Sequence, residues 1–170
     1  MRLFFGLEID PGTCLEIAGW RERMLPPLER PVPARNFHIT LVFLGDVAPA
    51  CREMLEFEAL DVTGSPFELT IDELGYFPKP GILWMGPTRV PDALSRLARE
   101  TGSVARRAGI RPAKRDYHPH LTLARRCRVP PPASSLPPDF QLAFTHFTLF
   151  ESITAKTGVH YQPLASWPLV

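Results

Sequence analysis

Two short segments of the sequence share a pattern that could perform acid–base chemistry on a phosphate. Each has a histidine, an apolar residue, a threonine and a second apolar residue, namely His38-Ile39-Thr40-Leu41 and His120-Leu121-Thr122-Leu123. Side chains alternate between the two faces of a β-strand, so each histidine shares a face with its threonine. Two such strands would supply two imidazoles and two hydroxyls to one polar cleft, a set suited to metal-free chemistry on a phosphate.

A third match, His146 with Thr148, shows that the pattern alone is not specific. Position distinguishes the three matches. His38 and His120 are separated by about half of the chain, as expected for two similar lobes with one motif each. His146 breaks that symmetry, and we predict a surface or partly buried strand histidine without a catalytic role.

The composition is that of a globular protein, with 45% hydrophobic residues and a formal net charge of +1 in 170 residues. This length suits one domain, residues 1–170, or two small lobes that share a core. Basic residues gather between Arg106 and Arg128, whereas acidic residues dominate between Cys51 and Gly75. The basic segment could steer a polyanion toward the second motif, or it could be a solvated helix face and loop.

The three cysteines are widely spaced and form no Cys-x-x-Cys pair, so we expect reduced thiols, no zinc site and a cytoplasmic protein. The apolar start of the chain is too short for a signal-peptide core, and no run is long enough to span a membrane. We expect a monomer without a cofactor.

Hydrophobic periodicity and breaker residues predict alternating strands and helices. The expected helices are residues 11–24, 49–60 and 91–108. Asp10 is the expected N-cap of the first helix. The third helix has the clearest amphipathic spacing, and Gly109 suits its C-terminal cap. The expected strands are residues 2–9, 37–44, 67–76, 82–85, 120–124, 140–151 and 161–169, and residues 129–138 are expected to form a proline-rich loop. This order indicates an α+β fold with helices outside a largely antiparallel core.

The two motifs and their flanks resemble the 2H phosphoesterase superfamily, and within it the RNA 2′,3′-cyclic phosphodiesterases, also described as 2′-5′ RNA ligases. The segments that carry the resemblance are Arg2 to Leu7, Asn36 to Gly45, Leu83-Trp84, His118 to Arg125 and Phe147 to Ser152. The resemblance implies two pseudo-symmetric α+β lobes of mainly antiparallel sheet, outer helices and a cleft between the lobes. It also implies hydrolysis of a 2′,3′-cyclic phosphate at an RNA end, or of a small cyclic nucleotide, to a 2′-phosphomonoester.

Two histidines suit this reaction because one can activate water and the other can protonate the leaving ribose oxygen. The residues alone leave these two roles interchangeable, whereas the resemblance implies that His38 is the proton donor and His120 the proton acceptor. Thr40 and Thr122 could donate hydrogen bonds to the non-bridging phosphate oxygens.

Three further residues are candidates for substrate binding. Arg125 matches a family arginine and could pair with phosphate. Regular strand alternation would put Arg125 on the face opposite His120, so the strand must end or bulge before residue 125 if Arg125 is to reach the site. Phe37 and Tyr117 could stack on a base, although core packing is the alternative for each. His118 and His120 could ligate a metal, but no third ligand is evident, and we predict turnover in excess chelator.

The sequence leaves two other function classes open. One is a related 2H enzyme that acts on small cyclic phosphates or 2′-5′ linkages, including 2′-5′ RNA ligation. The other is an RNA-binding module that kept the fold without chemistry, and the intact pairs of histidine and threonine argue against it.

Overall fold

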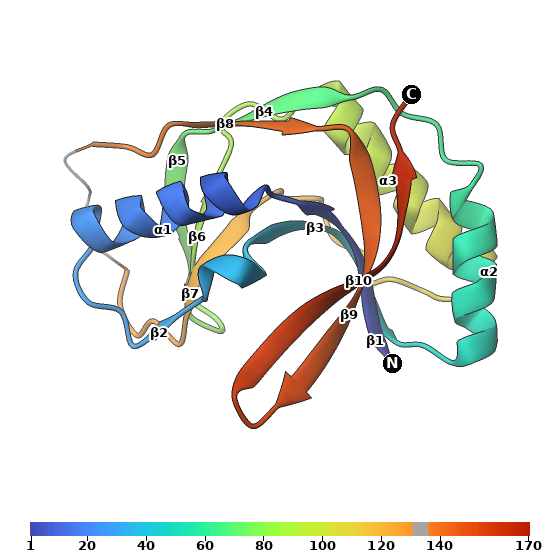
Figure 1. Ribbon diagram of the computed structural model, residues 1–170, viewed down its shortest axis with the longest axis horizontal. Helices are drawn as coiled ribbons and strands as arrows, with labels where there is room; N and C mark the ends of the chain where they lie inside the picture. Colours follow the sequence, from blue (N-terminus) through green and yellow to red (C-terminus); the bar gives the residue numbers. More distant parts are fainter. Residues whose placement is uncertain (131–135) are drawn as a thin grey trace.

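The computed structural model describes residues 1–130 and 136–170, and its strands form two four-stranded antiparallel sheets and one two-stranded ribbon (Figure 1). The first sheet has the order β10 (Gly158–Pro168), β9 (His146–Ala155), β1 (Arg2–Glu8) and β3 (His38–Asp46). The second has the order β2 (Arg30–Pro31), β7 (Leu121–Arg125), β6 (Ile82–Gly86) and β5 (Glu73–Phe77). The ribbon pairs β4 (Phe67–Ile71) with β8 (Phe140–Phe144). Each four-stranded sheet therefore receives one of the two motifs.

Within the described residues, three α-helices lie outside these sheets, as predicted. They are α1 (Pro11–Met24), α2 (Pro49–Ala59) and α3 (Asp92–Arg107), and a single 3-10 turn, η1 (Ala34–Asn36), precedes β3. Figure 1 shows α1 on one side of the molecule and α2 and α3 on the other, with the β9–β10 hairpin extending beyond the sheets.

The helix ends follow from the local sequence. The Asp10 carboxylate accepts the backbone N–H of Thr13 at the start of α1, with Pro11 in the first turn. At the end of α3, Gly109 has a φ of +85°, and Ile110 donates its backbone N–H to the carbonyl of Ala105. That pair of features is the Schellman ending that glycine permits. The buried face of α3 contains the predicted residues Leu94, Leu97, Ala98, Thr101, Val104 and Ala105.

Two predicted strands are wrong in their extent, because the chain changes sheets inside each of them. Residues 67–76 form β4 and β5, which pair with β8 and β6 respectively. The break falls at Asp72, whose carboxylate accepts hydrogen bonds from the backbone N–H and the hydroxyl of Thr88. Residues 140–151 likewise divide at Thr145, whose carbonyl accepts the backbone N–H of Leu169 while β8 and β9 join different sheets.

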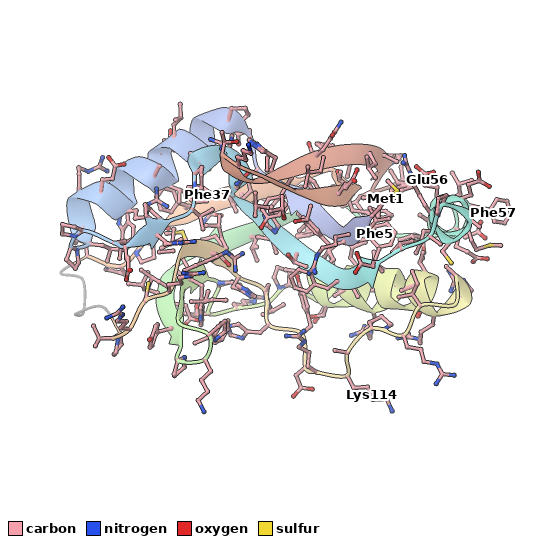
Figure 2. The ribbon with its side chains drawn as sticks, turned by 90° about the horizontal axis from the view of Figure 1, so that it is seen from below. Met1, Phe5, Phe37, Glu56, Phe57 and Lys114 are labelled. Carbon is pink, nitrogen blue, oxygen red and sulfur yellow. The ribbon has the colours of Figure 1, made fainter. Side chains whose placement is uncertain are left out.

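One hydrophobic cluster runs through both sheets and all three helices. Its fully buried members include Phe5 of β1, Ile17 of α1, Leu55 of α2, Met85 of β6 and Leu94 of α3. Figure 2 shows side chains filling the space between the layers, with Phe5 inside and Phe57 of α2 outside. The shared core fixes the two motif strands relative to each other. Among residues 1–130 and 136–170, no helix is both long enough and apolar enough to cross a membrane.

Candidate active site

The two motifs occupy corresponding places in the two sheets. His38 and Thr40 lie at the start of β3, and Ile39 between them is fully buried. Thr122 lies on β7, with His120 directly before that strand, and Leu121 is fully buried. In both cases the apolar partners enter the core, so the histidine and threonine face away from it. The predicted alternation therefore holds at both motifs.

Both histidines are oriented by the same backbone contact. Nδ1 of His38 lies 2.8 Å from the carbonyl oxygen of Asn36, and Nδ1 of His120 lies 2.8 Å from that of His118. A carbonyl only accepts, so each Nδ1 carries a hydrogen and donates it. In the neutral ring Nε2 therefore carries the basic lone pair, which makes it the atom that can accept a proton.

Thr40 adds a second contact to His38. Its Oγ1 lies 3.0 Å from Nε2 of His38, and the hydroxyl donates to the ring as long as the imidazole is neutral. When Nε2 gains a proton, the ring becomes the donor and the threonine hydrogen is released for another acceptor. Protonation of His38 and hydrogen bonding by Thr40 are therefore coupled.

The surroundings of His38 oppose its charged form. Burial is the main reason that its pKa falls from 6.5 to about 4, because the charged ring loses hydration. The bond to Asn36 works in the opposite direction, and the positive charges of Arg125 and His120 lower the pKa further. His38 is therefore neutral at pH 7 in the empty site.

Burial also lowers the pKa of His120 below its ordinary value. The bond to the carbonyl of His118 opposes this shift, whereas the charges of His118, Arg125 and Arg115 add to it. Because Arg125 acts on both histidines, and His120 acts on His38, the motifs share one electrostatic environment. A bound anion would raise the pKa of both rings.

Arg125 reaches this environment because β7 contains a bulge, one of the two alternatives predicted for this strand, the other being an earlier strand end. Thr122 pairs with Trp84 and Ala124 pairs with Leu83, which leaves Leu123 as an extra residue without a partner on β6. Leu123 and Ala124 are both fully buried, so the alternation resets and Arg125 returns to the face of Thr122. Arg125 is exposed, and within the described residues it forms no ion pair.

Phe37 is not placed to stack on a base. It is 4% exposed and belongs to the hydrophobic core, where the guanidinium of Arg21 lies 5.2 Å from its ring centre. The prediction that Phe37 binds substrate is therefore wrong, because residue 37 shares the inward face with Ile39.

Tyr117 is half-buried, and its hydroxyl donates to the carbonyl oxygen of Thr40 at 2.9 Å. Burial raises the pKa of this phenol, so it remains a hydrogen-bond donor. The bond links the segment that leads into the second motif with the strand of the first motif. Tyr117 thus has a positioning contact rather than a free ring face, and its predicted substrate role remains a prediction.

Aromatic side chains surround each histidine, and sequence reasoning did not identify them as a set. Ring centres of Phe4, Phe150 and Tyr161 lie 4.9, 6.2 and 4.7 Å from that of His38. These residues come from β1, β9 and β10, which are distant in sequence from β3. Only the pairing of those strands brings them together, so no local pattern could reveal them.

His120 has an aromatic neighbourhood of its own. The ring centres of Phe77 and Trp84 lie 5.3 and 6.2 Å from that of His120, and His118 lies 4.6 Å from Trp84. The Leu83-Trp84 segment was singled out in the sequence, but its place beside His120 depends on the pairing of β6 with β7.

Asn36 is another residue that sequence reasoning missed. Its carbonyl holds His38, and its buried side chain donates from Nδ2 to the carbonyl of Val159 on β10 at 2.8 Å. Tyr161, two residues further along β10, packs against His38. Asn36 therefore ties the β9–β10 hairpin to the first motif.

His146 makes different contacts from the other two histidines. Its Nε2 lies 3.7 Å from Oε2 of Glu8, and its Nδ1 lies 3.3 Å from the hydroxyl of Thr145. In the part of the chain that the structure describes, no group of three or more His, Cys, Asp or Glu side chains is placed to hold a metal ion. The ring of His118 packs on Trp84 instead of converging with His120 on a third ligand.

Comparison with known proteins extends these observations. A model of the 2′-5′ RNA ligase superfamily matches residues 9–137, a span that contains both motifs. The chain belongs to the 2′-5′ RNA ligase superfamily. Over an alignment of 173 residues it is 35% identical to the RNA 2′,3′-cyclic phosphodiesterase of Escherichia coli (strain K12), and the alignment covers 99% of this chain and 96% of that protein.

Two further comparisons cover nearly the whole chain. The RNA 2′,3′-cyclic phosphodiesterase of Archaeoglobus fulgidus is 29% identical over 181 residues, with 96% of this chain and 98% of that protein aligned. The crystal structure of E. coli LigT complexed with 3′-AMP superposes with a TM-score of 0.89 at 34% identity, covering 99% of this chain and 97% of that chain. The predicted α+β fold is confirmed. The superfamily match ends before the β9–β10 hairpin, whereas the likeness to LigT extends through it.

Proposed function

We propose that this chain is an RNA 2′,3′-cyclic phosphodiesterase that hydrolyses a terminal 2′,3′-cyclic phosphate to a 2′-phosphomonoester. The observation that carries the proposal is the pair of histidines, each with Nδ1 fixed by a backbone carbonyl and Nε2 available for proton transfer. Membership of the superfamily and full-length relatives named for this activity support it. One chain carries both motifs, so we propose that a monomer spanning residues 1–170 acts as one catalytic unit.

In this mechanism His120 is the base and His38 is the acid. Nε2 of neutral His120 takes a proton from water, and the water oxygen forms a bond to phosphorus opposite the 3′ oxygen. The bond from phosphorus to the 3′ oxygen breaks, and that oxygen takes the proton from Nε2 of protonated His38. The product is a 2′-phosphomonoester with a free 3′ hydroxyl. The net change is the addition of one water, with no oxidant or cofactor.

The anionic substrate itself would generate the acid. His38 is largely neutral in the empty site, since its pKa is about 4. A phosphodiester anion beside the ring favours the imidazolium form and raises that pKa. Protonation also releases the Thr40 hydroxyl from Nε2, so Thr40 can donate to a non-bridging oxygen where negative charge builds up. Thr122 would do the same from the second sheet.

Arg125 is the candidate phosphate ligand. The bulge at Leu123 returns its side chain to the face of Thr122, and its charge influences both histidines. A guanidinium in this position could neutralise the substrate phosphate and keep it between the two imidazoles.

The test is incubation of the purified chain with an oligoribonucleotide that ends in a 2′,3′-cyclic phosphate, in water enriched in ¹⁸O. We expect one ¹⁸O atom in the phosphate and a 2′-phosphate product, with both read by mass spectrometry and ³¹P NMR. A 3′-phosphate product would contradict the proposed roles of His38 and His120. The absence of turnover would reject the function.

The same experiment addresses the other function classes when a second RNA with a free 5′ hydroxyl is added. Formation of a 2′-5′-linked product without ¹⁸O would identify ligation as the main activity. Binding without a change in either RNA would identify a binding module. We expect hydrolysis to predominate, and we expect the same rate in excess EDTA.

A further inference from the structure

Arg30 and Arg125 lie directly opposite each other on neighbouring strands. Arg30 of β2 is the register partner of Arg125 of β7, and β2 is an edge strand of the second sheet (Figure 1). Directly opposed residues of an antiparallel pair have their side chains on the same face, so Arg30 shares the face of Arg125 and Thr122. Two like charges in this arrangement repel each other and destabilise the folded chain.

Neither arginine forms an ion pair in the part of the chain that the structure describes, and both are exposed. Glu29, the acidic residue next to Arg30 in the sequence, lines a pocket with Cys127 and Arg128 that excludes Arg30 and Arg125. Burial raises the pKa of the Cys127 thiol, and the charge of Glu29 raises it further. Because neighbouring side chains of a strand alternate, Glu29 faces away from the two arginines. Only an anion from outside the chain would remove their repulsion.

The two neighbours of β7 have different chemistry on the face of Thr122. On β6 this face carries Ile82, Trp84 and Gly86, none of which is charged. On β2 it carries Arg30. A substrate anchored at Thr122 therefore meets uncharged residues in one direction and a cation in the other. The sugar–phosphate backbone of an RNA is an anion, so its favoured path leads over β2.

The spacing of the two arginines suits successive phosphates of one RNA strand. The charge of Arg125 contributes to the lowered pKa of both His38 and His120, so Arg125 belongs to the site of the reacting phosphate. Arg30 lies on the next strand, about 4.8 Å away, a spacing shorter than an arginine side chain. A phosphate bound to Arg30 is thus a close neighbour of one bound to Arg125. The phosphodiester on the 5′ side of the terminal ribose is the anion that an RNA brings to this place.

We propose that Arg30 binds the phosphodiester on the 5′ side of the terminal nucleotide, so that the site takes RNA chains in preference to mononucleotides. This proposal rests on the function proposed above. Arg125 then holds the reacting phosphate, and each of the two opposed guanidiniums gains an anion when RNA binds. A cyclic mononucleotide with a free 5′ hydroxyl leaves Arg30 without one. Contacts to the phosphate backbone carry no base information, so this preference for a chain is independent of its sequence.

The first test compares two dinucleotide 2′,3′-cyclic phosphates that differ only in the bond between their nucleosides. One has the natural phosphodiester, and the other has an uncharged methylphosphonate. For the wild type we expect the KM of the charged dinucleotide to be about fivefold lower with kcat nearly equal, as for one hydrogen bond that is equally strong in the ground state and the transition state. In Arg30→Gln this KM ratio should fall below about twofold, because the cation that distinguishes the two bonds is gone.

Arg128→Gln is the matched control. It removes the same charge from an exposed side chain close to Arg125 in the sequence, but one that lines the pocket with Glu29. It should therefore keep the wild-type KM ratio. A ratio that Arg30→Gln leaves unchanged would overturn the proposal. An equal loss of the ratio in Arg128→Gln would also overturn it, because the effect would then come from the general positive field of this segment.

The second test does not require turnover. The same two dinucleotides, prepared as 2′-monophosphates, are titrated into the wild type and Arg30→Gln, and Kd is measured by calorimetry. The wild type should bind the charged dinucleotide more tightly, by a margin that shrinks as KCl is raised, and Arg30→Gln should lose that margin. A margin that persists in Arg30→Gln, or that is absent from the wild type, would contradict the site. If the wild-type chain hydrolyses no cyclic phosphate, the proposed function fails, and this titration still decides whether Arg30 binds an RNA phosphate.

Discussion

At the scale of single residues, the two histidines should be far more sensitive to substitution than any other histidine. Each is proposed to transfer one proton, so His38→Ala and His120→Ala should each lower kcat by about 10²-fold or more. His146→Ala should stay within about twofold of the wild type, because its ring contacts Glu8 and Thr145. The measurement is steady-state hydrolysis of a nucleoside 2′,3′-cyclic phosphate. A silent His38→Ala with an inactive His146→Ala would overturn the pairing.

The lowered pKa values of the two histidines predict how activity depends on pH. The profile of kcat/KM reports ionisations of the free enzyme, and that of kcat reports those of the bound complex. Burial holds the pKa of both rings below 6.5 in the empty site, to about 4 for His38. The kcat/KM bell should therefore have its maximum below pH 6.5.

The bound phosphodiester anion favours imidazolium and raises both pKa values, so the kcat bell should lie at higher pH than the kcat/KM bell. Both profiles come from one set of initial rates measured between pH 4 and pH 9. Coincident bells, or a kcat/KM maximum above pH 6.5, would contradict acid–base catalysis by this partly buried pair.

At the scale of the elements, Tyr117 and Tyr76 form a matched pair that separates positioning from stability. Each hydroxyl donates to a backbone carbonyl, Tyr117 to Thr40 in the first motif and Tyr76 to Cys127 beyond β7. Tyr117→Phe and Tyr76→Phe should each cost about 1 kcal/mol of unfolding free energy in urea. Only Tyr117→Phe should lower kcat, by about fivefold, because only that bond joins the two motif segments. Equal kcat values for the two variants would show that the bond to Thr40 has no positioning role.

The elements also show how far sequence reasoning extends. The helices were predicted nearly to the residue because caps and amphipathic spacing are local signals, as at Asp10 and Gly109. The two long strands were predicted without their breaks. The breaks lie at Asp72, which contacts Thr88, and at Thr145, which contacts Leu169. A pattern of alternating residues within one strand contains no information about these contacts. A strand ends where its partner changes, and the partner is determined by the tertiary fold.

The site shows the same division between local and non-local information. His38, Thr40 and Thr122 share the expected faces because alternation is a local property of a strand. Alternation required β7 either to end or to bulge before Arg125, but the bulge and its position at Leu123 depend on the register of β7 against β6. For Phe37 both base stacking and core packing were considered, and the same alternation puts it in the core.

At the scale of the whole molecule, Arg21 connects the elements that hold the two motifs. It is 7% exposed, and its Nη1 donates to the carbonyls of Val32 and Leu123 at 2.7 and 2.8 Å. The same guanidinium lies over the ring of Phe37, the residue before His38 of the first motif. One side chain of α1 thus contacts the approach to the first motif and the bulged residue of the second.

Substitution of Arg21 should therefore affect both stability and activity. Arg21→Met keeps most of the side-chain volume but removes the donor. The carbonyl of Val32 then loses the hydrogen bond from Arg21. The carbonyl of Leu123, in the bulge, keeps only its hydrogen bond from the backbone N–H of Val32. An orphaned buried carbonyl costs about 1–3 kcal/mol, although this loss is reduced because the variant no longer buries a charge. We expect a net destabilisation of roughly 1–2 kcal/mol in urea unfolding.

The activity of Arg21→Met separates packing from positioning. A loss of about 2 kcal/mol leaves nearly all molecules of an ordinary domain folded under assay conditions, so a purely structural role would leave kcat/KM unchanged. Because the bulge aims Arg125 at the shared site, we expect kcat/KM to fall about tenfold, with the loss largest at low substrate concentration. Arg23→Met, two residues further along α1 at an exposed position, should change unfolding by less than about 0.5 kcal/mol and leave kcat/KM unaltered. If Arg21→Met unfolds earlier yet retains full kcat/KM, the connection through α1 contributes to stability alone, and the two sheets hold the motifs without it.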